Sequence, residues 1–191
     1  MSLNEFILAF IGVIIGLGVA DLLTSFHKLL RAGSRVKWDW LTLFYAVLML
    51  YSMIVFWWWQ FGYPGAGRTL TTADFLPKFV FLAISFLMVA AALPDDLPEE
   101  GVIDMRAFYL ASLRHRWGLT AASLIMSSGT SAYYIVGAAR WDRLPGQALV
   151  LGSVILALLA TRIRSIWFQV LAIGWIFGVT SWFNMFRPIG P

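Results

Sequence analysis

The residues of this chain whose types and spacing could do chemistry lie on one face of its first long apolar segment. They follow one another at helical spacings of three, four and three residues: Gly18, Asp21, Ser25 and Lys28. An ionisable group such as Asp21 costs about 2.5–3.5 kcal/mol inside a membrane on insertion scales, so it needs water or a basic partner. Two interpretations stay open. Asp21 is an ion or proton site in a polar pathway, or it pairs with Lys28 or an arginine and only fixes helix packing.

A second polar stripe carries hydroxyl groups along the fourth apolar segment. Thr120 begins it, and its candidate pathway members are Ser123, Ser127 and Ser131. Such hydroxyls can line a wet path or bind a small ligand. More often they bond a neighbouring helix or their own backbone, at about 1 kcal/mol or less per contact. Packing is therefore the commoner role, and a pathway shared with the Asp21 stripe is the functional alternative.

Two histidines, His27 and His115, fall near the same ends of their apolar segments and are the only candidates for metal or haem ligands. No cysteine occurs in the chain, and no carboxylate cluster completes such a site. A phosphate loop, a nucleophile elbow and a paired-histidine helix motif are also absent from the sequence. We therefore expect no enzyme activity, no metal and no cofactor.

The elements that would position these residues are long apolar helices. Hydrophobic residues make up 60% of the 191 positions and charged residues 13%, far from the balance of a soluble domain. Six segments are apolar enough and nearly long enough to cross a bilayer, which takes about 20 residues. They are 6–30, 40–61, 75–93, 117–138, 144–161 and 165–186. The sequence predicts an all-α polytopic transmembrane helix bundle with short loops, as one domain over 1–191.

The acidic connection after the third span is expected to open a helix. Pro98 suits the first turn, and Glu99 and Glu100 complement the positive end of the helix dipole. From Val102 to Trp117 apolar and basic residues alternate at helical spacing. We expect an amphipathic segment here, either lying in the membrane interface or extending the fourth span.

Small residues predict where helices approach closely. They form two stripes of this kind, one with Gly12, Gly16 and Ala20 in the first span, the other with Gly174 and Gly178 in the sixth. Together with the short loops, these stripes predict a homo-oligomer or a place in a larger membrane complex.

The distribution of basic residues predicts the orientation. With six crossings, most of them fall on one side: Lys28, Arg31, Arg35, Lys37, Arg106, Arg114, Arg116, Arg162 and Arg164. Fewer fall on the other side: Arg68, Arg140, Arg143 and Arg187, with Lys78 at its border. The richer side belongs in the cytoplasm, which places both termini outside a bacterial inner membrane. The net charge of +4 is thus explained by topology and lipid contact, and not by nucleic-acid binding.

Several strings of residues resemble a family of small uncharacterised bacterial inner-membrane proteins with six spans. They are Ile15–Leu23, Trp40, Val55–Trp58, Leu93–Asp95 and Arg114–Trp117. This resemblance covers most of the chain and implies no assigned activity. The Trp-rich end of the second span is also similar to that of six-helix bacterial potassium leak channels. Those channels carry Phe-Ser-Asp near the start of their first span, where this chain has Phe10-Ile11-Gly12, so no pore residue is transferred.

These observations favour a small channel or transporter subunit with a polar pathway on the first and fourth spans. The alternative is a non-catalytic accessory or assembly subunit of a larger membrane complex. A haem- or quinone-binding electron carrier is a third and weaker hypothesis.

The orientation is directly testable because the chain contains no cysteine. Single cysteines placed at Gly65, Ala139 and Gly190 should react from outside intact cells with a membrane-impermeant maleimide. Labelling only after the membrane is broken would reverse the topology.

Overall fold

The structure is a computed structural model that describes residues 3–61 and 72–184, and it is mostly helical, as predicted. Its helices are α1 (Leu3–Ala32), α2 (Trp40–Phe61), α3 (Thr72–Ala90), α4 (Met105–Ala111), α5 (Leu113–Gly137), α6 (Leu144–Ala160) and α7 (Ile166–Asn184). Single turns of 3-10 helix lie at η1 (Gly33–Arg35) and η2 (Trp141–Arg143). Two strands of two residues each, β1 (Val36–Lys37) and β2 (Ile103–Asp104), are an addition to the all-α expectation.

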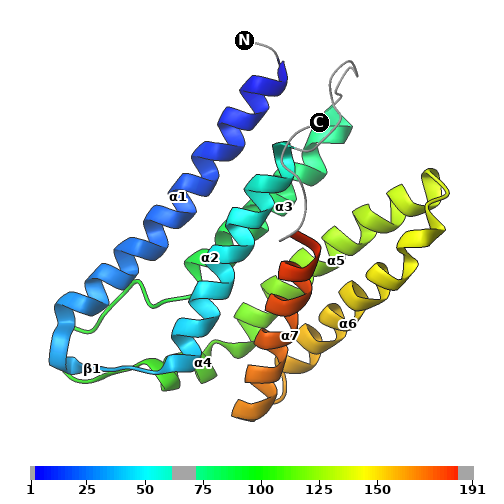
Figure 1. Cartoon of the computed structure of the whole chain (residues 1–191). Helices are drawn as coiled ribbons and strands as arrows, with labels where there is room; N and C mark the ends of the chain where they lie inside the picture. Colours follow the sequence, from blue (N-terminus) through cyan, green and yellow to red (C-terminus); the bar gives the residue numbers. More distant parts are fainter. Residues whose placement is uncertain (1–2, 62–71, 185–191) are drawn as a thin grey trace.

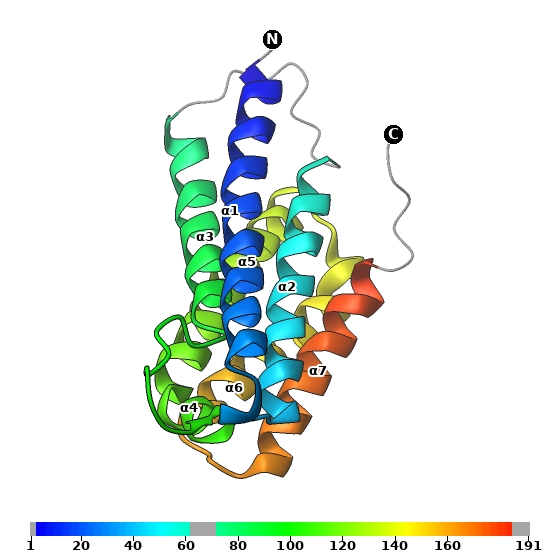
Figure 2. The same cartoon turned by 90° about the vertical axis from the view of Figure 1, so that its left-hand side faces the viewer.

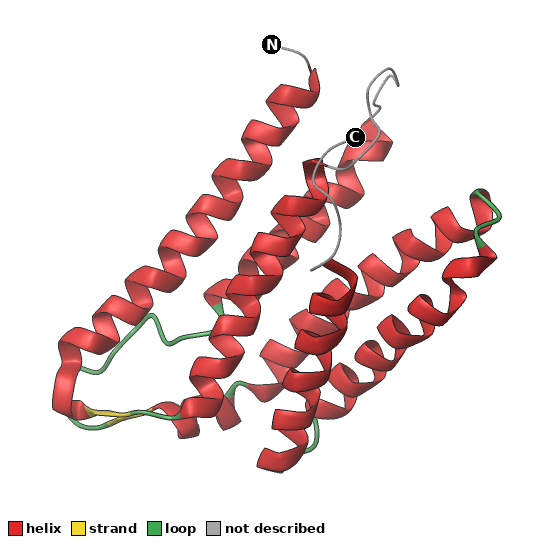
Figure 3. Ribbon diagram, in the orientation of Figure 1, coloured by secondary structure: helices red, strands yellow, loops and turns green. Residues whose placement is uncertain are grey.

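The long helices run alternately up and down, and the short helix α4 lies at the lower end of the bundle (Figures 1 and 2). Helices α1, α2 and α3 pack against one another, while α6 packs between α5 and α7. Contacts of α2 with α7 and of α3 with α5 join the two groups. The helical character of almost all of the described chain is evident in Figure 3.

The lower end of the bundle is tied together by backbone bonds between distant segments. α1 stops where Gly33 adopts a φ of +55°, a left-handed conformation that suits glycine. The following strand β1 then pairs in parallel with β2, with Val36 opposite Ile103. Arg35 Nη1 donates to the carbonyl oxygens of Pro98 at 3.1 Å and of Glu99 at 2.5 Å. The first connection and the acidic connection therefore form one unit.

The expectation that the acidic connection opens a helix is wrong. Residues 94–102 form bends, and Gly101 has a φ of +96°, which interrupts any helix that would start at Pro98. The helix begins instead at Met105, because the Asp104 side chain accepts a bond from the Ala107 backbone N–H at 2.9 Å. The amphipathic segment thus becomes α4, a separate helix that buries Met105 and Tyr109 and ends at Ser112.

Apolar length differs among the helices. Within the described residues, three segments are long and apolar enough to cross a membrane: Glu5–Arg35, Trp40–Trp58 and Trp141–Ala160. Two shorter apolar helices cover Phe75–Ala90 and Ile166–Trp182. Helix α5 is long but less apolar, because it carries charged residues in its first turn and hydroxyls along its length. The number of six spans stays a prediction.

The outer surface of the bundle is strongly apolar. Large side chains point away from the protein on every long helix, including Leu17 of α1, Ile54 of α2 and Ile155 of α6. On α7, Trp167 is 82% exposed and Trp182 is 72% exposed, whereas buried polar residues such as Gln147 and Gln169 lie inside. A water-soluble monomer rarely shows so much apolar surface, so this arrangement fits a lipid environment.

The close approach involving α1 is at Gly18, a member of the polar stripe. A Cβ at this position would lie 2.7 Å from Met53 Cε of α2 and 3.4 Å from Phe86 Cδ2 of α3. In contrast, Gly12 and Gly16 have no atoms of other helices within 4 Å of such a Cβ, and Ala20 is exposed.

The stripe in the last helix is also open within the described chain. Gly174 and Gly178 are exposed, and a Cβ added at either position would meet nothing within 4 Å. A closer contact between α6 and α7 is made by Gly152, where a Cβ would lie 3.7 Å from the Trp175 ring. Both predicted stripes are thus left for contacts outside this chain, and that role stays a prediction.

A pair of substitutions separates the two faces of α1. Gly18→Leu should lower the stability of the detergent-solubilised protein by about 1–3 kcal/mol, because it overpacks the site against Met53 and Phe86. Gly16→Leu is the matched control and should leave the thermal unfolding midpoint unchanged, since the site is open. Equal destabilisation by both variants would contradict this packing.

Candidate functional site

The predicted polar stripe of α1 meets the acidic connection. Ser25 is buried, and its Oγ donates a hydrogen bond to Asp95 Oδ1. One turn further on, Lys28 Nζ donates to the Asp95 backbone carbonyl at 3.0 Å. Asp21, one turn before Ser25, is half-buried. The structure therefore brings Ser25 and Lys28 together around Asp95, a residue that the sequence pattern does not single out.

The ion pair considered for Asp21 is not formed. An ion pair in the described ranges joins Arg140 Nη2 to Asp142 Oδ2 at 3.0 Å, on the exposed turn η2, far along the chain from Asp21. Lys28 bonds a carbonyl oxygen instead of the Asp21 carboxylate. The lower end of α1 is therefore fixed by two hydrogen bonds to Asp95, from the Ser25 hydroxyl to its carboxylate and from Lys28 to its backbone oxygen.

The hydroxyl stripe of α5 lies on a helix that packs against α3 and α6. Ser123, Ser127 and Ser131 are half-buried on α5, and α3 packs against both α1 and α5. The polar contact that fixes the α5–α6 pair comes from another residue, Ser128. Its hydroxyl and carbonyl oxygens lie 2.6 Å and 3.0 Å from Gln147 Nε2. A pathway shared by the two stripes stays a prediction.

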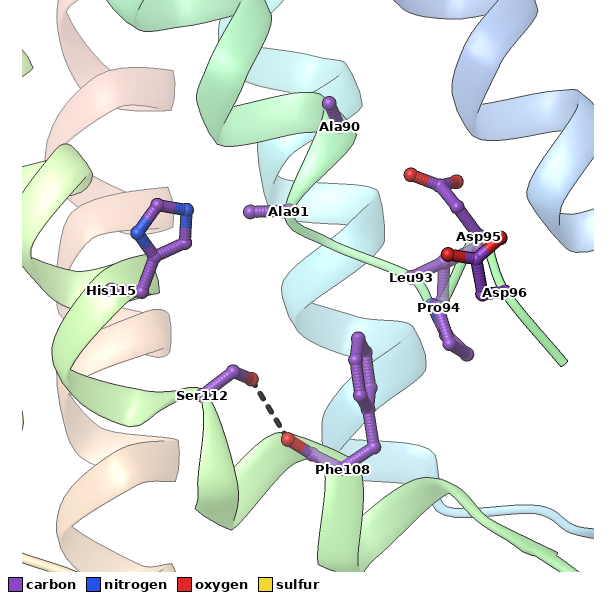
Figure 4. Close-up of a pocket in the computed structure, with 9 residues that line it drawn as sticks. All are labelled: Ala90, Ala91, Leu93, Pro94, Asp95, Asp96, Phe108, Ser112 and His115. Atoms are coloured by element: carbon purple, nitrogen blue, oxygen red, sulfur yellow. Dashed lines mark hydrogen bonds between the residues drawn. The ribbon is translucent and has the colours of Figure 1, made fainter. Parts of the chain in front are cut away.

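A cavity of about 390 Å³ lies between the end of α3, the acidic connection and the junction of α4 with α5. Figure 4 shows Asp95 and Asp96 on one side of it and Ser112 and His115 on the other. The ring of Phe108 points up between them (Figure 4). The cavity is therefore lined by groups that can accept, donate or carry a proton.

The other histidine of the sequence, His27, does not line this cavity. His27 is exposed on α1 and is not among the lining residues, so the two histidines do not share the site. Within residues 3–61 and 72–184, no group of three or more histidine and carboxylate side chains is placed to hold a metal ion.

Next to His115 in α5 lies a fully buried arginine. The Arg116 side chain is enclosed by aromatic rings, with Cζ 4.5 Å from the ring centroid of Phe108, 5.1 Å from Tyr109 and 5.4 Å from Tyr45. None of its three guanidinium nitrogens has a hydrogen-bond partner among the described residues. An arginine keeps its charge under all ordinary conditions, so the cation is held by aromatic faces alone.

The main chain of Arg116 is anchored to α2. Its carbonyl oxygen accepts bonds from Thr120 Oγ1 at 3.0 Å and from Tyr45 Oη at 3.3 Å. Tyr45 Oη also lies 3.0 Å from Thr120 Oγ1. The Tyr45 ring packs edge-on against the Trp117 ring, with the ring centroids 5.6 Å apart. The Tyr45 ring beside the guanidinium is therefore fixed by its own hydrogen bonds.

One glutamine connects this region to the last two helices. Gln169 Oε1 accepts bonds from Tyr109 Oη at 2.9 Å and from Trp117 Nε1 at 2.6 Å. Its Nε2 donates to the carbonyls of Ile163 at 2.6 Å and Ala160 at 3.2 Å, which close the end of α6. Burial raises the pKa of the Tyr109 hydroxyl, so this group stays protonated and acts as a donor.

Sequence reasoning misses this cluster for identifiable reasons. The charge pattern places Arg116 among the interfacial basic residues, Tyr109 and Trp117 read as apolar positions, and Gln169 stands as an isolated polar residue. The one signal in the sequence is the spacing of Arg116 and Thr120, which places an arginine and a hydroxyl on one face of a helix.

No protein-family model, curated protein or solved structure matches this chain. The resemblance to small inner-membrane proteins therefore stays a prediction. What is shown is a mostly helical protein with apolar helices compatible with a membrane location.

The Gln169 hub gives a stability prediction. Gln169→Leu should destabilise the protein by about 2–5 kcal/mol, because it leaves the buried Tyr109 hydroxyl and Trp117 N–H without an acceptor. The control is Thr130→Ala, which removes only an exposed hydroxyl bonded to its own helix. Thermal unfolding of both variants in the same detergent checks this, and equal midpoints would contradict it.

Proposed function

We propose that this chain is a six-span integral protein of a bacterial inner membrane with both termini outside. The apolar outer surface supports the membrane location. The connections near β1, the acidic connection and the turn between α6 and α7 share one end of the bundle (Figure 1). Most basic residues lie there, which is the charge bias expected of a cytoplasmic end.

We further propose a channel- or transporter-type subunit whose solute-binding site is the cavity between α3, α4 and α5. The observation that carries this proposal is the cavity itself, with two carboxylates on one side and a histidine and a hydroxyl on the other. Ligand sites in helical proteins form in such gaps between helices, with a few polar groups that set specificity. Nothing in the arrangement resembles a nucleophile activated by a base, so the proposed role is binding and passage without catalysis.

This proposal gives the α1 stripe a different role from the one predicted. Ser25 and Lys28 hold Asp95, which forms one wall of the cavity. They therefore position the site, while Ser123, Ser127 and Ser131 stay candidates for a path along α5.

A second candidate function, an accessory subunit of a larger membrane complex, is favoured by the exposure of α1. Only 22% of its candidate span is buried, less than in the candidate spans containing α2 (39%) and α6 (28%). The smooth face with Gly12, Gly16 and Ala20 is open, so another helix can approach it.

A flux assay tests the first proposal. Proteoliposomes with the wild-type protein should pass at least one of protons, potassium, sodium, chloride and inorganic phosphate. Asp96→Asn should reduce that flux about tenfold or more, because it removes a charge from the cavity wall. Asp142→Asn is the control, since it changes an exposed carboxylate on the turn η2 and should leave the flux unchanged.

The outcomes separate the two functions. Equal flux in the wild type and in Asp96→Asn would remove the cavity from the pathway. Wild-type vesicles that pass none of these ions would contradict the transport proposal and favour the accessory subunit.

A further inference from the structure

The buried guanidinium of Arg116 lacks the partners that such a group requires. A charge taken out of water costs several kcal/mol unless a counter-charge and hydrogen bonds compensate it. Here all three nitrogens are buried and have no partner among the described residues. The five N–H groups of an arginine in this state form an unused set of donors.

The aromatic rings account for only part of this cost. The faces of Phe108, Tyr109 and Tyr45 attract the cation, but a ring face accepts no conventional hydrogen bond. The two tyrosine hydroxyls are also engaged, one with Thr120 and the Arg116 carbonyl and the other with Gln169. The protein therefore holds the guanidinium in place but leaves its N–H groups without acceptors among the described residues.

One side chain, Phe108, contacts both the Arg116 guanidinium and the cavity. Phe108 lines the cavity and also stacks on Arg116 at 4.5 Å, so its ring is the wall between them. This ring is only half-buried, unlike Tyr109 and Tyr45. The Phe108 side chain carries no polar group, so no hydrogen bond holds its ring in this position.

We propose that Arg116, with His115 from the cavity wall, forms a site for a phosphate group that reaches the guanidinium when the Phe108 ring turns aside. Arginine binds phosphate through two parallel N–H···O bonds, and a remaining phosphate oxygen can accept from the histidine. This inference rests on the proposed function, since it names the ligand of the same cavity.

The two carboxylates that line the cavity do not act as the counter-charge of Arg116. The Asp95 carboxylate accepts a bond from Ser25, which directs it towards α1. In Figure 4, Asp95 and Asp96 lie on the side of the cavity opposite His115. An acidic side chain from the described part of this chain therefore does not neutralise Arg116, and an anion from outside can approach on the histidine side.

Free phosphate and the phosphate of a lipid headgroup share this chemistry. The test therefore uses inorganic phosphate and, separately, vesicles of phosphatidylglycerol or of digalactosyldiacylglycerol, whose headgroup has no phosphate, at equal protein density. The purified protein is first titrated with sodium phosphate against sodium chloride of equal ionic strength, with thermal unfolding as the readout.

The wild-type midpoint should rise with phosphate and not with chloride. Arg116→Met, which keeps the volume of the side chain, should weaken the apparent phosphate affinity about tenfold or more. The same variant should be at least as stable as the wild type without phosphate, because an uncompensated charge has been removed. Phe108→Ala opens the wall and should bind phosphate at least as tightly as the wild type.

Arg114→Met is the matched control, since it removes a neighbouring exposed arginine and should leave the phosphate response unchanged. A rise in stability with phosphatidylglycerol alone identifies a lipid headgroup as the source, and a rise with inorganic phosphate identifies a soluble anion. Both support the site if Arg116→Met abolishes them. An unchanged response in Arg116→Met, or no response of the wild type to either probe, would overturn the inference. If the wild type still conducts ions in that case, the proposed function stands and only its ligand is wrong.

Discussion

The Oε1 atom of Gln169 is the point on which the lower half of the bundle depends. It accepts from Tyr109 of α4 and from Trp117 of α5, while the amide nitrogen of the same residue bonds the carbonyls at and after the end of α6. One side chain of α7 thus fixes the position of three other helices. In an apolar environment a lost partner is not replaced by solvent, so this arrangement fixes the geometry as well as the stability of the region.

The Arg116 enclosure follows from that geometry. Tyr109 is held by Gln169 and Tyr45 by Thr120, so two of the three rings around the guanidinium have a fixed orientation. Phe108 has no polar group and is held by packing alone. Of the three rings around the buried cation, Phe108 is therefore the one that no hydrogen bond holds.

The helical class and the positions of the long helices could be predicted because hydrophobicity and length are properties of local sequence. The predicted segments 6–30, 40–61 and 75–93 fall within or largely overlap α1, α2 and α3. The start of α4 could not be predicted correctly, because Pro98 with two glutamates is a stronger local signal than the Asp104 cap. The buried cluster was not predicted either, because Arg116 and Gln169 are connected through Tyr109 by tertiary contacts that no spacing along one helix encodes. The close approach at Gly18 was not predicted for the same reason: contact within the chain is decided by where Met53 and Phe86 lie. The smooth stripe of Gly12, Gly16 and Ala20 stays a predicted contact with another chain.

The parallel pairing of β1 with β2 has a consequence for the order in which the protein assembles. Arg35 and its carbonyl partner in Pro98 are separated by 63 residues, and α2 and α3 lie between them in the chain. The connection between the first two helices therefore cannot reach its final form while they are being synthesised. Closing this long loop is slow compared with forming a helix, so it sets a late step in folding. Until then α1 lacks this tie to the acidic connection, so the first of the described helices is among the last to be locked in place.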